Sequence, residues 1–341
     1  MIEPHLPDIK IVTSVACLQK LEKEWCELWD RAHEPRFFQR HCWAAEAWEK
    51  LFSLKGWQLH ILTARIDGFL VAILPLVRKP TLFGHSRFRY LTHAQHLQDV
   101  LLDRLLAGTN TAGCVLESML AACDGTLVLT PVRSDSHLAC LFNDRRVKLR
   151  QVSNAHVGYL RGREFDAYIR ANSKTTLRKE NLTYRRLLDF GAVSSYRVTG
   201  KDEIVQGLNW LFSRKKHWAW KNRKIPRSWM RDRKALAALE ACVLEGCSEG
   251  WASLLSICID GKPSAFALVF NDNGIVTSLV STQKFLGNGI SIGTALLLAQ
   301  YRLQVFRGAA VIDMLGTTTP EKRALTDTEI EQFELTVTPF T

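Results

Sequence analysis

The spacing of hydrophobic residues predicts helices and a hairpin in the first half of the chain. Leucines and tryptophans recur three or four residues apart over residues 17–32, which predicts a helix, and a second helix is predicted over 42–52. Two apolar stretches flank Asp67-Gly68, a dipeptide typical of the tight turn of a β-hairpin. Shorter strands are predicted near 87–91, 100–102 and 126–130, with a helix over 113–122. The pattern therefore indicates a mixed α/β domain.

The second half repeats this order. Its predicted helices cover residues 164–170, 173–190, 202–218 and 228–245, with a strand over 193–198. Three strands follow, joined by turns at Asp260-Gly261 and Asn273-Gly274, and then a glycine-rich turn, a helix over 291–306 and a buried strand over 309–315. When Asp67-Gly68 is aligned with Asp260-Gly261, the order helix, helix, hairpin recurs. We therefore predict two similar α/β domains in tandem, 1–155 and 156–341.

Composition and the apolar runs indicate the cellular compartment of the protein. The longest apolar runs, such as residues 69–77, are about half the length of a membrane-spanning helix. Residues 1–10 show no basic region followed by an apolar stretch, as a signal peptide would. The nine cysteines are scattered and form no Cys-x-x-Cys pair. We therefore expect a cytoplasmic protein.

Positive charge is concentrated in one stretch. Residues 161–235 hold 20 Lys and Arg against 7 Asp and Glu, a net charge of +13, while the whole chain carries +11. Such a stretch attracts polyanions, which include RNA, a phosphate-bearing cofactor and an anionic membrane surface. Within it, residues 213–224 interleave aromatic with basic side chains, a pattern that suits stacking on nucleic acid or a lipid interface. One of Trp218 and Trp220 is expected in the core. The alternative interpretation of the basic stretch is a set of ordinary, solvated helix faces.

The glycine-rich turn before the last long helix is the clearest chemical signal. Gly287, Gly289 and Gly293 surround Ser291 at the predicted helix start. Uncovered backbone N–H groups and the helix dipole at such a turn attract an anion such as a pyrophosphate. The turn is not the dinucleotide-binding fingerprint, because the preceding strands form antiparallel hairpins. An ordinary glycine-rich connection is the alternative.

Antiparallel strands, a glycine turn, a helix and a further strand form the core order of the GNAT acyltransferases, and the chain resembles that superfamily. Residues 284–289, KFLGNG, resemble its cofactor signature Arg/Gln-x-x-Gly-x-Gly/Ala. The segments FFQRHCWAAEAWEKLF, SIGTALLL and IDMLG resemble a tandem-domain subgroup. That subgroup includes acetyltransferases of cellulose biosynthesis and, more distantly, the Fem-type peptidoglycan aminoacyl transferases. The resemblance implies two tandem GNAT-like domains, each a mixed, mostly antiparallel sheet flanked by helices.

The resemblance also implies acyl transfer from a thioester, usually coenzyme A, to an amine or hydroxyl. Acyl-CoA would be a co-substrate rather than a permanently bound cofactor, and the second domain would hold it. The residues expected to bind it are Lys284, Gly287, Asn288, Gly289, Ser291, Gly293 and Arg178. The first domain lacks the glycine turn and would support the second. The chain departs from relatives at Ile292, where they have proline, and at TTTPEKR, which leaves only Lys322 or Arg323 of an expected Tyr-Lys pair.

Three residues are candidates for catalysis. Asp313 ends a buried strand beside the cofactor helix, where its alternative role is to cap the following turn. His217 is a candidate base because imidazole titrates near neutrality. Relatives often carry an acid where Asp99 lies, which suggests a place in the acceptor pocket. His93 and His96 near Asp99 lack a third well-spaced ligand, so we expect no metal site.

The sequence thus favours an acyl-CoA-dependent N-acyltransferase. Its acceptor would be an amine such as an amino lipid, a long-chain base or an amino sugar, with an anionic membrane surface as a further partner. One alternative is a Fem-type enzyme with aminoacyl-tRNA as donor, for which the +13 stretch would bind RNA. Another is a non-catalytic module that binds nucleic acid or membrane. DNA is not an expected partner.

Overall fold

The computed structural model describes residues 7–81, 86–92, 97–286, 292–316 and 319–339. By its internal contacts the chain divides into two compact units. Unit 1 comprises Met1–Ser153, Arg233–Leu239 and Glu331–Thr341, and unit 2 comprises Asn154–Asp232 and Glu240–Ile330. The break after Ser153 lies close to the boundary predicted at 155/156, but two later segments group with unit 1.

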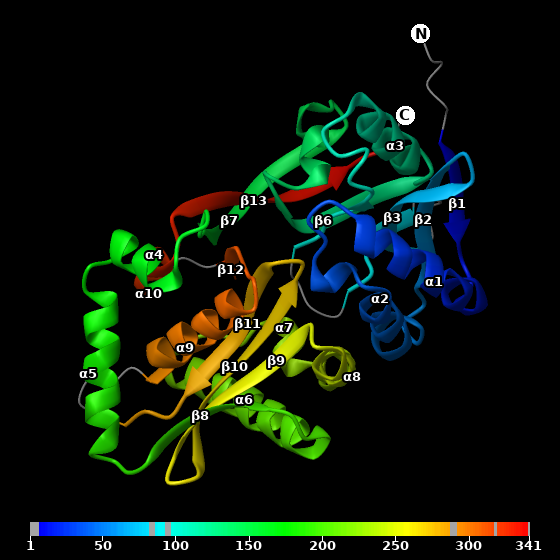
Figure 1. Cartoon of the computed structure of the whole chain (residues 1–341). Coiled ribbons are helices and arrows are strands. Elements are labelled where there is room, and N and C mark those ends of the chain that lie inside the picture. The colour runs from blue at the N-terminus through cyan, green and yellow to red at the C-terminus, as the bar shows by residue number, and fades with distance from the viewer. Residues whose placement is uncertain (1–6, 82–85, 93–96, 287–291, 317–318, 340–341) are drawn as a thin grey trace. The chain divides into compact units, whose positions relative to one another are not determined.

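Unit 1 is built on a sheet in the order β1-β2-β3-β4-β6-β13, with the short β5 beside β3 (Figure 1). Its elements up to the unit boundary are β1 (Asp8–Val12), α1 (Val15–Arg31), η1 (Phe37–Gln39), α2 (His41–Ala47), a π-helical turn (Trp48–Phe52), β2 (Gln58–Ile66), β3 (Phe69–Lys79), β4 (Ser86–Tyr90), β5 (Leu101–Leu102), α3 (Asn110–Ala121), β6 (Gly125–Arg133), η3 (His137–Asn143) and β7 (Val147–Tyr159). Successive side chains of a strand point to opposite faces. Ile61 and Ile73 accordingly pack in the cluster with α1 and α2, and Leu62 and Leu74 in the cluster with α3.

Unit 2 has the sheet order β7-β12-β11-β10-β9-β8. The elements after β7 are α4 (Phe165–Asn172), α5 (Thr176–Leu188), β8 (Val193–Val198), α6 (Lys201–Lys221), α7 (Ser228–Arg231), α8 (Arg233–Glu249), β9 (Ala252–Ile259), β10 (Lys262–Asp272), β11 (Ile275–Gln283), α9 (Ile292–Phe306), β12 (Val311–Gly316), α10 (Pro320–Leu325) and β13 (Thr328–Val337). Of these, the start of α8 and most of β13 group with unit 1. Leu255 and Ala267 pack with α9, whereas Leu254 and Phe266 lie close to Gly207 of α6. Helices α9 and α6 therefore cover opposite faces, as Figure 1 shows.

The two units share one topology. In unit 1, the hairpin β2-β3 leads to β4, α3 and β6, and β4 pairs with β6 in parallel. In unit 2, the hairpin β9-β10 leads to β11, α9 and β12, and β11 pairs with β12 in parallel. The last strand of each sheet comes from elsewhere in the chain: β13 pairs with β6, and β7 pairs with β12. This repetition confirms the predicted fold class of two α/β halves in tandem, each with a mixed sheet flanked by helices.

The predicted hairpin turns are present because each central residue adopts the left-handed conformation that such turns need. Asp67 and Gly68 have φ of 51° and 82°, and Asp260 and Gly261 have 49° and 70°. Three strands were not predicted from the sequence: β1, β7 and β13. In the described part of the chain, no helix combines the length and hydropathy needed to cross a membrane.

Candidate functional site

A cavity of about 590 Å³ opens in unit 2 where two parallel strands diverge. Strands β11 and β12 pair only at their beginnings, Ile275–Thr277 with Val311–Asp313. Beyond this point the remainder of both strands, Ser278–Ser281 with Gln283 on one side and Met314–Gly316 on the other, lines the cavity. The divergence leaves backbone groups that no neighbouring strand covers. An extended ligand could therefore enter between the strands.

A β-bulge lies on the cavity side of β11. Leu268 of β10 is opposite Val280, and the next residue, Val269, is opposite Ser278, so Leu279 has no opposing residue. A bulge interrupts the ladder and redirects the local backbone. Because Leu279 also lines the cavity, this irregular backbone faces the space where a ligand would lie.

The cavity is strongly basic. Lys215 and Lys224 come from α6 and the segment after it, Arg227 precedes α7, and Lys322 lies in α10. Among the described residues that line the cavity there is no Asp or Glu. Cations that face one space without counter-charges raise the local concentration of anions. The lining therefore suits a ligand that carries phosphate or carboxylate groups.

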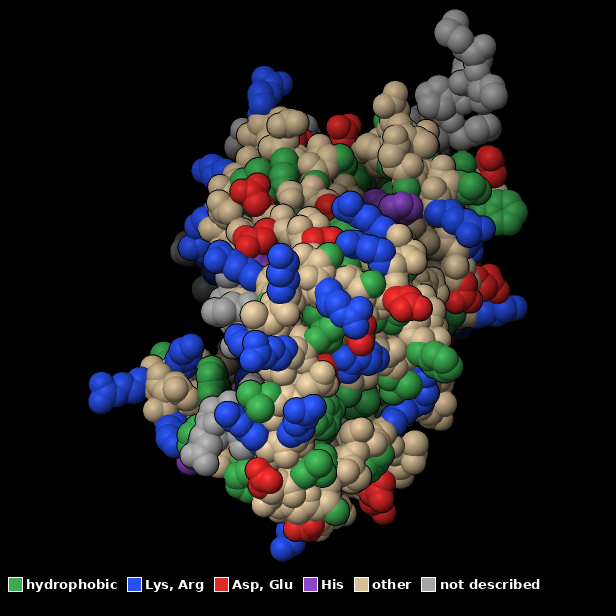
Figure 2. All heavy atoms as spheres, turned by 60° about the vertical axis from the view of Figure 1, so that its left-hand side comes forward, with side chains coloured by type: hydrophobic (Ala, Val, Ile, Leu, Met, Phe, Trp, Pro, Cys, Tyr) green, Lys and Arg blue, Asp and Glu red, His purple; other side chains and the backbone are tan. Residues whose placement is uncertain are grey.

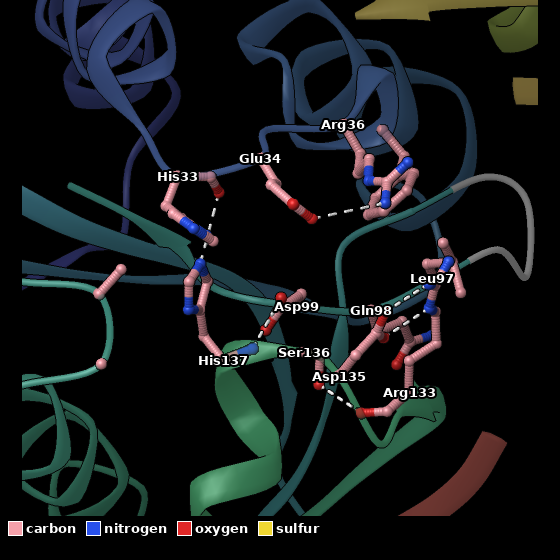
Figure 3. Close-up of a pocket in the computed structure, with 13 residues that line it drawn as sticks. His33, Glu34, Arg36, Leu97, Gln98, Asp99, Arg133, Asp135, Ser136 and His137 are labelled. Carbon is pink, nitrogen blue, oxygen red and sulfur yellow. Dashed lines mark hydrogen bonds and ion pairs between the residues drawn. The ribbon is translucent and has the colours of Figure 1, made fainter. Parts of the chain in front are cut away.

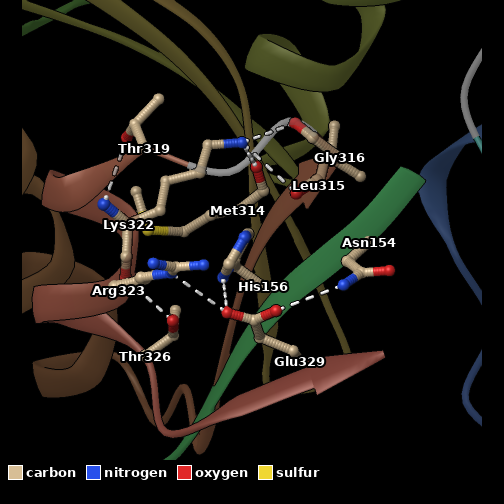
Figure 4. A network of polar contacts seen from close by, with 10 residues as sticks. All are labelled: Asn154, His156, Met314, Leu315, Gly316, Thr319, Lys322, Arg323, Thr326 and Glu329. Atoms are coloured by element: carbon tan, nitrogen blue, oxygen red, sulfur yellow. Dashed lines mark hydrogen bonds and ion pairs between the residues drawn. The ribbon is translucent and has the colours of Figure 1, made fainter. Parts of the chain in front are cut away.

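Lys322 is the most constrained of these cations. Thr319 caps α10 by accepting the Lys322 N–H at 3.3 Å. The Lys322 Nζ donates to the backbone oxygens of Met314 at 2.6 Å, Leu315 at 3.2 Å and Gly316 at 2.7 Å (Figure 4). Burial is the main cause that lowers the pKa of Lys322 to about 8; Arg227 and Lys215 contribute to this shift, and Asp313 opposes it. Near neutral pH this amine can therefore give up its proton at small cost.

A polar cluster beside α10 joins the start of β13 to β7. The Glu329 carboxylate accepts hydrogen bonds from Asn154 Nδ2 and Arg323 Nε, each at 3.2 Å (Figure 4). His156 Nδ1 lies 3.9 Å from Glu329 Oε1. The imidazole is buried, and this burial lowers the pKa of His156. The cluster holds the side chain of Arg323 at Glu329. Of the two candidates Lys322 and Arg323, Lys322 is therefore the one that lines the cavity.

The structure gives Asp313 a supporting position. Its side chain is fully buried in β12, and its Oδ1 accepts the N–H of Leu315 at 2.8 Å. Leu315 has a φ of 55°, so this hydrogen bond holds a left-handed residue in the turn that presents carbonyls to Lys322. Asp313 is not among the residues that line the cavity, and it reaches the site through its charge on Lys322.

Three other predicted residues lie away from the cavity lining. His217 is exposed on α6, and Arg178 is exposed on α5. Lys284 is half-buried, and its backbone N–H donates to the Ser264 oxygen at 2.7 Å. The described structure therefore does not bring these three side chains to the cavity. The prediction that one of Trp218 and Trp220 belongs to the core is wrong, because both are exposed.

Most of the glycine turn cannot be compared with the structure. Gly287, Asn288, Gly289 and Ser291 lie outside the described residues, so the binding of a diphosphate by their backbone N–H groups stays a prediction. Gly293, in the first turn of α9, does line the cavity. Its N–H donates to the side-chain oxygen of Gln283. A phosphate at this amide would have to displace the Gln283 side chain.

Asp99 belongs to a separate, smaller cavity of about 270 Å³ in unit 1 (Figure 3). Its carboxylate accepts backbone N–H groups from Val100 at 2.9 Å and from His137 and Leu138 at 3.1 Å each. Burial raises the pKa of the Asp99 carboxyl. These three bonds give Asp99 a clear structural role at the base of η3. Arg36 and Asp99 are two of the charged residues that line this cavity.

Sequence reasoning missed Lys215 and Arg227. Lys215 lies four residues after Leu211 and four before Ala219, both of which are buried, so it continues the inner stripe of α6. That spacing could have marked Lys215 as an inward-facing cation within a run of basic residues. Its half-buried amine donates to the Ser281 oxygen at 3.1 Å, and burial lowers the pKa of Lys215. For Arg227 the local pattern carries no comparable signal.

Solved structures share this architecture, whereas no family model and no curated protein sequence matches the chain. FemX matches with a TM-score of 0.64 at 11% identity, over 95% of this chain and 96% of FemX. The C-terminal DUF2156 domain of a putative lysylphosphatidylglycerol synthetase from Agrobacterium fabrum matches with a TM-score of 0.54 at 10% identity, over 94% and 92%. L-PGS from Bacillus licheniformis matches with a TM-score of 0.51 at 10% identity, over 94% and 91%.

None of these three structures belongs by name to cellulose biosynthesis, so that narrower resemblance stays a prediction. The broader resemblance to the tandem GNAT and Fem-type group is confirmed at the level of the fold. The chain shares with FemX a fold of two similar α/β halves in tandem.

Proposed function

We propose that the chain is an acyltransferase whose unit 2 cavity holds an anionic activated acyl donor and whose acceptor is an amine. The observation that carries this proposal is the basic cavity at the divergence of β11 and β12. Acyl-CoA is the first candidate donor, because its pantetheine is an extended chain and its phosphates are anionic. Unit 1, which lacks the glycine turn, would support the donor unit.

The proposed chemistry uses groups that are already in the cavity. The acceptor amine must lose a proton as it attacks the acyl carbonyl. Lys322, with a pKa of about 8, takes this proton as a neutral amine, whose lone pair has released one of the three carbonyl oxygens that the ammonium form contacts. The attack places negative charge on the carbonyl oxygen. Such charge is stabilised by backbone N–H donors and cations, and both the bulge at Leu279 and the amine of Lys215 lie on the cavity wall. The donor would leave as a thiol or, for an ester donor, as a hydroxyl.

Aminoacyl-tRNA is the second candidate donor. One observation favours it: Gln283 already occupies the N–H of Gly293, an amide that a CoA diphosphate would be expected to use. The neighbour named lysylphosphatidylglycerol synthetase attaches lysine, by its name, to a phospholipid, which is also acyl transfer. An RNA 3′ end would be attracted by the same cations.

Calorimetry and transfer assays distinguish the two donors. Acetyl-CoA and a charged tRNA mixture are titrated separately into the full chain. The variants Lys215→Met and Arg227→Met should weaken binding of the true donor about fivefold or more each, because each removes a cation from the cavity. Lys201→Met is the matched control, since Lys201 is exposed at the first position of α6. If neither donor binds, or if both cavity variants bind like the control, the assignment of the site is rejected.

The pH dependence of transfer tests the role of Lys322. If the neutral amine is the base, kcat/KM should rise with pH around a midpoint near 8. Lys322→Met should lower kcat/KM by about 10²- to 10⁴-fold and remove that midpoint. A rate that instead falls above pH 8 would show that the protonated amine is needed and would refute the assignment of the base.

A further inference from the structure

Large apolar side chains are exposed at the mouth of the unit 2 cavity. Trp218 and Ile225 line the cavity, and 45% and 81% of their surfaces are exposed. Phe285 is 83% exposed. The Nζ of Lys221 lies 5.8 Å from the centroid of the Phe285 ring, which places Phe285 beside the end of α6. We call Trp218, Phe285 and their neighbour Ile225 the aromatic rim.

Cations surround the aromatic rim. Residues 213–227 contain seven Lys and Arg and no Asp or Glu. The ammonium groups of Lys215 and Lys224 lie over the Trp218 ring, 4.9 and 5.3 Å from its centroid. Figure 2 shows one face of the molecule on which Lys and Arg side chains lie among exposed hydrophobic side chains. Exposed apolar groups within a basic surface mark a binding face rather than an ordinary solvated surface.

The composition of the aromatic rim favours a lipid surface over RNA. Aromatic rings flanked by lysines suit the boundary between headgroups and acyl chains, where the rings bury apolar area and the amines stay near phosphates. Ile225 gains by burial in lipid but offers no ring on which a nucleobase could stack. The amines of Lys215 and Lys224 already lie over the Trp218 ring that a base would need. Seven cations without an acid match anionic headgroups.

We propose that the aromatic rim docks on an anionic bilayer, so that the cavity opens toward the membrane and receives a lipid-borne amine as acceptor. The acceptor part of this inference rests on the proposed transferase function. The docking part depends only on the surface of unit 2. The two parts can therefore fail separately.

Vesicle flotation of the full chain tests the docking. Vesicles of phosphatidylcholine alone are compared with vesicles that contain 30% phosphatidylglycerol, at about 0.1 M and about 0.5 M salt. The chain should bind the anionic vesicles and not the neutral ones, and high salt should weaken binding, because exposed charges are screened.

Matched variants locate the docking face. Ile225→Ser and Phe285→Ser should each weaken binding about tenfold or more, since each removes a large exposed apolar surface. Phe306→Ser is the control: Phe306 is 90% exposed but ends α9, whose opposite end lines the cavity about 20 Å away along the helix. For charge, Lys221→Glu should weaken binding more than fivefold, whereas Lys201→Glu at the other end of α6 should not.

A second measurement reports insertion directly. Brominated lipids should quench part of the tryptophan emission, and the quenched fraction should fall in Trp218→Phe, which conserves an aromatic side chain. Equal binding to neutral and anionic vesicles, or rim variants that bind like the Phe306 control, would overturn the docking. Binding of tRNA that the rim variants abolish, without vesicle binding, would assign the face to RNA instead.

Turnover separates this inference from the proposed function. Vesicle binding without any acyl transfer would leave the docking intact and refute the transferase. Transfer to a soluble amine without vesicle binding would support the transferase and refute the docking.

Discussion

The ion-pair cluster of Arg302 gives the sharpest stability prediction. Arg302 of α9 donates from Nη1 and Nη2 to the two oxygens of Glu180 on α5, both at 2.6 Å, and from Nε to Asp166 on α4 at 2.8 Å. Only 2% of Glu180 is exposed, and the two carboxylates raise the pKa of Arg302. The cluster therefore ties three helices together around a buried charge.

The substitution Arg302→Met removes the cation and keeps most of the side-chain volume. It leaves the Glu180 carboxylate buried without its partner, a change that typically costs about 3–5 kcal/mol of unfolding free energy. For a unit of this size such a loss corresponds to roughly 10 °C in the unfolding midpoint. Asp166→Asn should cost less than about 1 kcal/mol, because that carboxylate is 41% exposed and its pair is partly screened.

Urea denaturation followed by circular dichroism measures these differences, with Arg185→Met as the control. Arg185 is exposed on α5, and its loss should change stability by less than about 0.5 kcal/mol. The double variant Arg302→Met with Glu180→Met should recover most of the loss, because no buried charge remains. If Arg302→Met unfolds like the control, or if the double variant is as unstable as the single one, the reasoning about a buried, paired charge is refuted.

Two further predictions concern packing and pH. A Cβ at Gly125 would overlap the backbone oxygen of Ser86 on β4, so Gly125→Ala should lower stability by more than about 2 kcal/mol. Gly113 lies in open space on α3, and Gly113→Ala should raise stability by up to about 1 kcal/mol. Equal urea midpoints for the two variants would contradict this prediction. The ring centroids of His60 and Phe88 lie 4.7 Å apart, and burial lowers the pKa of His60. As the pH falls below about 6.5, the unfolded state therefore binds a proton at this residue before the folded state does. Stability should therefore fall as pH drops below this value, and an unchanged slope in His60→Phe would exclude His60 as a cause.

Local patterns were enough to predict most helices and hairpins. Aspartate or asparagine followed by glycine set the turns, and the inner stripes of α1 and α6 set their helices, because these features depend on residues close in sequence. The strands β7 and β13 could not be predicted in this way. The first half of β7 is largely exposed, without a regular apolar alternation, and β13 is held by residues of β6 about 200 positions away. Their hydrogen-bond partners are set by the tertiary fold.

The same division holds for the candidate site. Local patterns were sufficient to show that a glycine-rich segment precedes α9, that positive charge gathers in residues 161–235 and that the chain has two similar halves. The three-dimensional fold was needed to show where β11 and β12 separate, which cations face the resulting cavity and which remain in solvent. It also decided the acidity of Lys322, because that depends on burial and on Arg227 and Lys215, which lie far from Lys322 in the chain. Cavities and pKa values arise from groups brought together across the fold, and no local pattern encodes them.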